Sequence, residues 1–174
     1  MAIKKILTEP NKLLRQISAP VEKVEETERE LMNDMLETMY SAKGIGLAAI
    51  QIGVPKRIIV MDLSKEENKK NPMYFVNPVI KKKNDQTLTY EEGCLSVPNQ
   101  FAEIDRPKTC EVEYLDYNGI KQNLKAEGLL ATCIQHEIDH LEGILFIDYL
   151  SKLKKEIIIK KLSKHRVKPD RIIV

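Results

Sequence analysis

The hexapeptide Gln135–His140 carries the clearest chemical pattern in the chain, because it places His-Glu-x-x-His inside a predicted helix. Positions four apart lie on one face of an α-helix, so His136 and His140 can bind one metal ion together. Glu137 is rotated by about 100° from His136, so it can reach a water molecule beside the ion without taking a ligand position. This pattern is typical of zinc hydrolases, in which the two histidines are ligands and the glutamate is the general base.

A catalytic site of this type usually has three protein ligands, and the sequence offers several candidates for the third. Cys94 lies in Glu-Gly-Cys-Leu-Ser, where the glycine permits close backbone approach and a nearby proline favours an extended segment. Cys110 falls at an inward strand position, and Cys133 would require three consecutive turns of one helix to reach a single ion. Glu156 belongs to an amphipathic terminal helix. Cys94 is therefore the favoured third ligand.

The segment Gly44–Gln51 reads Gly-Ile-Gly-Leu-Ala-Ala-Ile-Gln. It lacks the third glycine of the dinucleotide-binding fingerprint and follows a predicted helix instead of a strand, which argues against phosphate binding. The backbone from Gly44 through Ile45 to Gly46 could instead pair with an extended peptide. Gln51 offers a neutral amide donor, which suits an oxyanion hole because it stabilises negative charge without competing for the metal.

Hydrophobic periodicity predicts the elements that position these motifs. It indicates helices over 27–43, 129–142 and 151–166, and strands over 57–63, 73–80, 108–116 and 120–126. In the first helix, Leu31, Met35 and Met39 form a core stripe. Pro78 moves its strand towards a sheet edge or a bulge. The pattern predicts an α+β fold, with antiparallel β-sheets packed around a central metal-binding helix and a C-terminal α-helix outside.

The C-terminal helix is expected to begin after Ser151, a favourable N-cap residue. Its apolar face is predicted to consist of Leu153, Ile157, Ile158 and Leu162. Residues 151–174 hold nine basic side chains against Glu156 and Asp170, although the whole chain has a net charge of only +2. This charge could steer the protein towards a polyanion, or it could be a solvated helix face that aids solubility.

Length and composition set the outer limits. A chain of 174 residues predicts one domain over 1–174, and 43% hydrophobic with 31% charged residues is typical of globular proteins. Three cysteines without an export signal argue against a disulfide scaffold and allow a metal-binding thiol. No stretch is long and apolar enough to span a membrane, and the N-terminus has no secretory or transit pattern. We therefore expect a cytoplasmic protein with no membrane partner.

Taken together, three blocks in this order resemble the peptide deformylase family. They are Gly44–Gln51, Glu92–Ser96 (Glu-Gly-Cys-Leu-Ser) and Gln135–His140 (Gln-His-Glu-Ile-Asp-His). The resemblance covers nearly the whole chain, and the terminal helix is similar to that of the bacterial type. One departure is Phe101, which stands where several bacterial members have an arginine near the outer end of the substrate, whereas Arg106 is retained.

The resemblance implies a metal-dependent hydrolase that removes the N-formyl group from the N-terminal formylmethionine of new polypeptides and releases formate. The resemblance assigns the metal to Cys94, His136 and His140, with Glu137 as the general base. Gln51 and the backbone N–H of Leu95 would hold the oxyanion. The substrate site would include Gly44, Ile45, Gly46, Leu129 and Cys133, with His136 beside them in the wall of the methionine pocket.

The same resemblance favours Fe²⁺ as the native ion, although Zn²⁺, Ni²⁺ or Co²⁺ also suit one thiolate and two imidazoles. It further suggests that the basic C-terminal helix docks on the ribosome, near the nascent N-formylmethionyl peptides that would be the substrates. Two other functions fit part of the pattern. A peptidase would cleave unformylated peptides and use a carboxylate as third ligand, and a non-catalytic module that binds RNA would have a closed site with four ligands.

Overall fold

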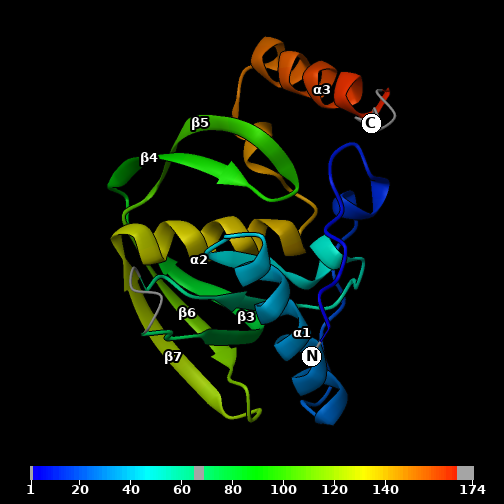
Figure 1. Cartoon of the computed structure of the whole chain (residues 1–174). Coiled ribbons are helices and arrows are strands. Elements are labelled where there is room, and N and C mark those ends of the chain that lie inside the picture. Colours follow the sequence, from blue (N-terminus) through cyan, green and yellow to red (C-terminus); the bar gives the residue numbers. More distant parts are fainter. Residues whose placement is uncertain (1, 65–68, 168–174) are drawn as a thin grey trace.

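Helix α2 (Gly128–Leu141) lies at the centre of the fold, between a large sheet and a small one (Figure 1). The computed structural model describes residues 2–64 and 69–167. The other helices are α1 (Glu26–Ser41) and α3 (Lys152–Val167), with short 3₁₀ helices η1 (Lys12–Arg15), η2 (Ala49–Ile52) and η3 (Phe146–Tyr149). The strands are β1 (Gly46–Ala48), β2 (Ile58–Met61), β3 (Met73–Lys83), β4 (Thr87–Cys94), β5 (Val97–Pro107), β6 (Thr109–Leu115) and β7 (Lys121–Glu127).

All strand pairs are antiparallel, and they form two separate sheets. The larger sheet has the order β1-β2-β3-β6-β7, and β4 pairs only with β5. In Figure 1 the β4–β5 pair lies above α2 and the five-stranded sheet lies below it. The predicted α+β architecture, with antiparallel sheets around a central helix and an outer C-terminal helix, is confirmed.

Helix α2 is buried on both sides because it has a sheet on either side. Ten of its residues are buried, and the apolar ones, including Ile134 and Leu141, pack against Phe75 and Val112 of the large sheet. This apolar packing fixes the rotation of the helix about its axis. The opposite face, which carries the two histidines, is thereby turned towards β4.

Helix α1 covers the other part of the large sheet. Met35 and Met39 are fully buried in one cluster with Leu47 and Val60, and Leu31 packs against this cluster while partly buried, so the predicted core role of the stripe is confirmed. Met32, which lies outside the predicted stripe, is also fully buried. The helix ends at Ser41, slightly before the predicted end. The physical reason is a tight turn in which Lys43 adopts a positive φ of 57°, so the helix has already ended before Gly44.

Strand β3 shows how the fold accommodates Pro78. The strand is internal, between β2 and β6, so the alternative of a sheet edge was wrong and the alternative of a bulge is confirmed. The register with β6 shifts between Val76 and Val79, around Pro78. A bulge releases the residue there from ladder pairing, so a proline without an N–H is tolerated.

The β4–β5 hairpin was not predicted as a strand pair; the sequence indicated only an extended segment near Cys94. Its inward positions include Leu88 and Ile104, but also the buried charged residues Glu92 and Arg106. Charged residues at inward positions interrupt the alternation of apolar and polar residues by which strands are recognised. The hairpin therefore escapes a prediction based on hydrophobic period.

Helix α3 begins after Ser151, whose Oγ accepts a hydrogen bond from the N–H of Lys154 at 3.4 Å. The prediction that four apolar residues share its packed face was wrong for two of them. Ile158 and Leu162 are buried, whereas Leu153 is 69% exposed and Ile157 45% exposed. Only one narrow side of the helix touches β5 and η3, so an i, i+4 pair suffices to cover the contact.

The final residues of the basic segment, with Lys168, Asp170 and Arg171, lie outside the described residues. Among the helices in the described part of the chain, none has the length and apolar character needed to cross a bilayer.

Candidate metal centre and active site

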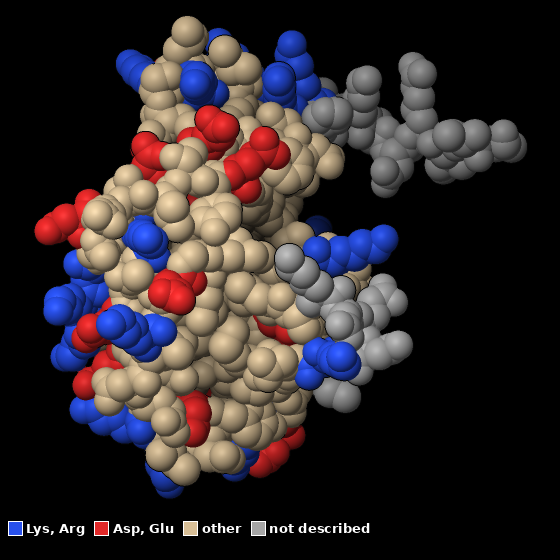
Figure 2. Space-filling model, turned by 90° about the vertical axis from the view of Figure 1, so that its left-hand side faces the viewer, with Lys and Arg blue, Asp and Glu red and all other residues tan. Residues whose placement is uncertain are grey.

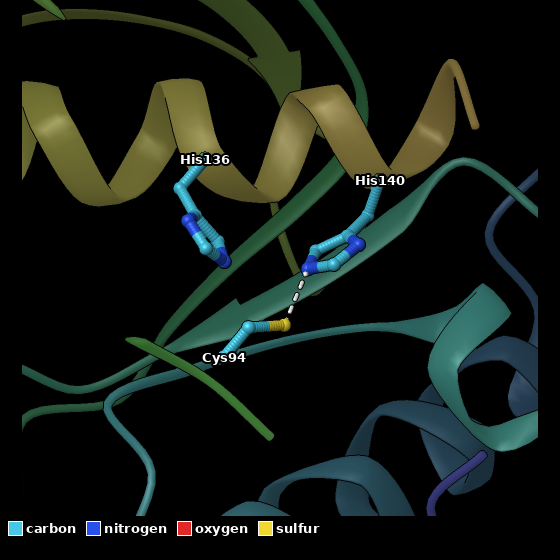
Figure 3. Close-up of side chains that lie close together, drawn as sticks. All are labelled: Cys94, His136 and His140. Carbon is cyan, nitrogen blue, oxygen red and sulfur yellow. Dashed lines mark hydrogen bonds between the residues drawn. The ribbon is translucent and has the colours of Figure 1, made fainter. Parts of the chain in front are cut away.

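Three potential metal ligands converge from two elements on one point. His136 and His140 project from α2, and Cys94 lies at the end of β4 (Figure 3). One donor atom from each of these side chains lies within 4.8 Å of the others, and the Cys94 Sγ is 3.3 Å from the His140 Nε2. The structure therefore brings together the three residues that the sequence singled out as ligands. Cys110 is buried in the core of the large sheet instead.

The ring of His136 is oriented by Glu92 of β4. The His136 Nδ1 is 2.8 Å from the Glu92 Oε2, and a carboxylate can only accept there, so Nδ1 carries the proton. The other ring nitrogen, Nε2, is left as the atom that can bind a metal ion, and it must give up any proton to do so. This arrangement, in which a carboxylate fixes the tautomer of a histidine ligand, is common around metal ions in proteins.

Arg106 of β5 holds Glu92 in turn. Its guanidinium makes two hydrogen bonds to the Glu92 carboxylate, at 2.6 and 3.0 Å, and one to the Asp139 Oδ2, at 2.8 Å. Tyr149 donates its hydroxyl to the same Asp139 oxygen at 2.7 Å, and the guanidinium lies over its ring. Although burial alone would raise the pKa of Glu92, its hydrogen bonds to His136 and Arg106 lower it, so the carboxylate stays ionised.

Sequence reasoning missed Glu92, Asp139 and Tyr149 as parts of the site. The available signal was the position of Glu92, two residues before Cys94 and at an inward position of the same strand. Asp139 precedes His140 on α2, and only the tertiary fold shows that it faces Arg106.

The two histidines titrate in opposite directions. Burial lowers the pKa of His140, and the neighbouring charge of His136 lowers it further. Burial also acts to lower the pKa of His136, but its interactions with Cys94 and Glu92 outweigh this effect and raise the pKa well above the usual value. Two imidazoles whose ring centroids are 5.0 Å apart would repel each other if both were charged, so at least one is held neutral.

Glu137 lies beside the ligands and is almost completely buried. Its Oε2 has no hydrogen-bond partner among the described residues, and burial raises the pKa of the carboxyl group to about 7. Its carboxylate lies directly against Gly46 of β1, because a Cβ at that position would come within 2.4 Å of the Glu137 Oε1. A buried carboxyl group with a pKa near neutrality can both accept and return a proton.

Gln51 is 1% exposed and anchored at both ends of its amide. The Oε1 accepts the backbone N–H of Ala48 at 2.8 Å, and the Nε2 donates to the Ser96 Oγ at 3.0 Å and approaches the Cys94 Sγ at 3.6 Å. These contacts fix which end of the amide is the donor. The donor end of Gln51 therefore faces the sulfur atom, and Leu95 follows directly in the chain.

A cavity of about 520 Å³ opens beside Cys94 and His136, between β1, the β4–β5 hairpin and α2. Its wall includes all five residues predicted to contact substrate: Gly44, Ile45, Gly46, Leu129 and Cys133. Ile45 and Leu129 are partly exposed at its mouth. Burial raises the pKa of the Cys133 thiol to about 12, so this cysteine stays protonated and contributes an apolar surface.

Comparisons with known proteins agree with this geometry. The family model described as polypeptide deformylase matches residues 3–156. The chain belongs to the polypeptide deformylase family. A peptide deformylase of Pelagibacter ubique is 78% identical over 174 residues, which is the full length of both chains, and one of Phenylobacterium zucineum is 61% identical over 95% of this chain and 98% of its own. The crystal structure of the Ehrlichia chaffeensis peptide deformylase in complex with actinonin has a TM-score of 0.91 and 45% identity, and the match covers 97% of this chain and all of that one.

As a deformylase, the chain is a metal-dependent hydrolase that removes the N-formyl group from the N-terminal formylmethionine of newly made polypeptides. The residues present fit a metal ion, because one thiolate and two imidazoles are a donor set that divalent transition metals accept. The unpartnered Glu137 Oε2 beside them leaves a buried acceptor for a ligand proton. Both features match a site with three protein ligands that stays accessible from a cavity.

Proposed function

We propose that Cys94, His136 and His140 hold one divalent cation and that the remaining site residues carry out deformylation around it. When bound, the cation supplies Lewis-acid polarisation of the formyl carbonyl and lowers the pKa of water in the site. The observation that carries the proposal is the convergence of these three donors beside Glu137, whose buried Oε2 has no hydrogen-bond partner in the part of the chain that the structure describes.

Glu137 is the general base and later the general acid in this proposal. Its Oε2 accepts a proton from the attacking water molecule and afterwards delivers it to the nitrogen of the leaving amine. The contact of its carboxylate with Gly46 supports the assignment, because Gly46 lies on the strand that faces the cavity. The proton donor would thus stand next to the peptide that is cleaved.

Gln51 and Leu95 stabilise the negative charge that develops on the formyl oxygen. The Gln51 Nε2 is a neutral donor beside Cys94, and the backbone N–H of Leu95 comes from the residue that follows the cysteine. Loss of one such donor typically reduces the rate by about 10²- to 10³-fold. The hydrogen bonds from Gln51 to Ala48 and Ser96 support a fixed orientation before substrate arrives.

The peptide backbone binds along β1, and the methionine side chain enters the apolar part of the cavity. Directly before β1, the Ile45 carbonyl accepts the N–H of Asp62. The alternating pattern of an antiparallel pair then turns the polar backbone groups of the next residue, Gly46, away from β2, and Gly46 lines the cavity. An extended peptide can add to such an edge. Leu129 and Cys133 of α2 supply apolar surface for the methionine, together with Gly44, Ile45 and the ring edge of His136.

We assign Fe²⁺ as the native ion, with Zn²⁺, Ni²⁺ or Co²⁺ able to substitute, because all four accept one thiolate and two imidazoles. The test is to purify the protein without oxygen, quantify its metals and reconstitute the apoprotein with each ion. We expect the highest kcat/KM with Fe²⁺ and a loss of activity in air. A zinc form that is as active as the anaerobic iron form would contradict the assignment.

The activity itself is tested by formate release from formyl-Met-Ala-Ser, and peptide-bond cleavage is followed in parallel as new free amino groups from the matched peptide Met-Ala-Ser. The proposal expects hydrolysis of the formylated peptide alone. Cleavage of the unformylated peptide alone would favour the peptidase alternative, and metal binding without any turnover would favour the non-catalytic alternative.

We further propose that the protein works in the cytoplasm at the ribosome, where its formylated substrates emerge, and that α3 docks there. The described side chains of α3 include five exposed lysines: Lys152, Lys154, Lys160, Lys161 and Lys164. Their charge would neutralise phosphates of ribosomal RNA, and such binding weakens steeply as salt increases.

The docking test is co-sedimentation with ribosomes at increasing salt. Replacing Lys160, Lys161 and Lys164 by Gln should weaken the association. The control variant replaces three exposed lysines outside α3, namely Lys82 and Lys83 at the end of β3 and Lys108 between β5 and β6, and it should bind ribosomes as wild type does. Substitution is preferable to deletion of α3, because Ile158 and Leu162 are part of a hydrophobic core. Equal effects of the two triple variants would contradict docking through α3.

A further inference from the structure

Phe101 is an exposed aromatic residue at the mouth of the substrate cavity. It lies on β5, is 65% exposed and contributes to the cavity wall. Its register partner on β4 is Gly93, and a Cβ on Gly93 would come within 2.6 Å of the Phe101 ring. The Cδ1–Cε1 edge of the ring therefore lies against the backbone next to Cys94, and much of the rest of the ring is exposed where a ligand in the cavity could reach it.

The same face of the hairpin carries unpaired negative charge. Glu91, also part of the cavity wall, is the register partner of Glu103, and both positions are exposed. Within the described part of the chain, neither side chain makes an ion pair or hydrogen bond. Figure 2 shows acidic side chains gathered on the part of the molecule below α3, where β4 and β5 lie, and the surface is hollowed below them.

The opposite wall differs in charge. Lys43, in the turn between α1 and β1, lines the cavity next to Gly44. Successive side chains of an extended peptide point in opposite directions. A residue that points to the β4–β5 wall would therefore meet Phe101 and Glu91, and its neighbour would point towards the wall that carries Lys43.

We propose that Phe101 and Glu91 select a basic residue at one of the two substrate positions that follow the methionine. The alkyl stem of lysine or arginine would pack on the exposed part of the Phe101 ring, and its charged end would lie near the carboxylates of Glu91 and Glu103. Aromatic rings attract cations placed over their faces, and long basic side chains bury their stems while the charge stays in water. This inference rests on the proposed function, because it assumes that formylated peptides occupy the cavity.

The experiment measures kcat/KM for two series of amidated peptides, formyl-Met-X-Ala and formyl-Met-Ala-X. X is Lys, norleucine, Ser or Glu, and amidation removes the C-terminal carboxylate. We expect a preference for Lys over Glu of about fivefold at one of the two positions, which is the size of an exposed charge contact. The preference should decrease as salt is raised, because exposed charges are screened.

Two variants separate the contributions of charge and stem. Glu91→Gln should reduce the preference for Lys over Glu to within about twofold, with little change for norleucine. Phe101→Ala should lower kcat/KM for Lys and norleucine alike, by about threefold, because it removes the surface for the stem. Glu30→Gln is the matched control, since Glu30 is exposed on α1 and outside the cavity wall, and it should leave the profile unchanged.

The outcomes distinguish this inference from the function on which it rests. If wild-type protein hydrolyses the formylated peptides but treats Lys and Glu equally at both positions, the inference is overturned and the function stands. The same holds if Glu91→Gln keeps the full preference. If no peptide in either series releases formate, the proposed function falls, and the inference falls with it.

Discussion

Helices α2 and α3 are of similar length but use their polar residues in opposite ways. On α2, Gln135, His136, Glu137 and His140 are all buried. Gln135, His136 and His140 each contact another element, whereas the Glu137 Oε2 and the His140 Nδ1 have no hydrogen-bond partner among the described residues. On α3, only Ile158 and Leu162 are buried among the positions whose burial is described, and most lysines face solvent. One helix is part of the interior and the other lies on it.

The difference shows where this protein concentrates its chemistry. A polar group without a partner is costly in the interior, and on α2 the buried His136 is supported by a network that extends to Glu92 and Arg106. The lysines of α3 keep their hydration and need no such support. We therefore expect single substitutions on or around α2 to have large effects, and those on α3 to have small ones.

The largest effect is expected for Glu137→Gln. The amide has nearly the same shape but cannot accept the proton, so kcat should fall by about 10²- to 10⁴-fold while metal content stays unchanged. Steady-state formate release with parallel metal analysis measures both. Glu156→Gln on α3 is the matched control, and it should keep full activity. Equal activity of the Glu137 variant and wild type would remove Glu137 as the base.

Arg106→Ala is expected to have the next largest effect, this time on stability. It leaves the carboxylates of Glu92 and Asp139 buried without their cation, and breaking such a network costs about 3–5 kcal/mol of unfolding free energy. Metal affinity should fall as well, by about 10- to 100-fold, because Glu92 orients His136.

Denaturant unfolding of the metal-free protein and a competitive chelator titration measure the two consequences of Arg106→Ala. Arg106→Lys should recover only part of the loss, because lysine cannot reproduce the two parallel bonds to Glu92. On α3, Lys164→Ala should change stability by less than about 0.5 kcal/mol. A similar stability change for Arg106→Ala and Lys164→Ala would contradict the expectation that substitutions around α2 have larger effects than those on α3.

A moderate effect is expected from the packed side of α3 itself. Ile158→Ala removes a buried side chain and should cost about 2 kcal/mol, at the low end for a core residue because the site can partly collapse. Leu153→Ala, on the exposed side of the same helix, should cost less than about 0.5 kcal/mol. Thermal or urea unfolding compares them directly, and equal losses would mean that the exposed side is packed in solution.

The smallest effect is expected for the lysines of α3. Replacing Lys160, Lys161 and Lys164 by Gln should leave kcat/KM for a short formylated peptide within about twofold of wild type, because solvent screens exposed charges over a Debye length. The measurement is the same formate assay at physiological ionic strength. A large loss with a short peptide would show that α3 contributes to the cavity and not only to docking.

The elements that could be predicted from sequence are those with local signals. The pairing of His136 with His140 follows from their spacing on a helix, and the core stripe of α1 follows from its period. The roles assigned to the site residues and the single domain over 1–174 stay predictions.

The parts that could not be predicted depend on contacts between distant segments. The β4–β5 pair was missed because the charged residues Glu92 and Arg106 occupy inward positions of its strands. Leu153 and Ile157 were predicted to be packed because the spacing of apolar residues along a helix does not show how much of the helix surface is in contact with its neighbours. The link from Tyr149 through Asp139 to Arg106 becomes visible only when η3, α2 and β5 are in place.

Gly46 has the Glu137 carboxylate on one side and is the point at which a substrate backbone would be held. The single hydrogen atom in place of a side chain thus sets the spacing between proton acceptor and scissile amide. A methyl group there would come within 2.4 Å of the Glu137 Oε1, so either the strand or the carboxylate would have to shift and the distance between them would change. Binding of the substrate backbone and transfer of the proton thus both depend on the absence of a side chain at Gly46.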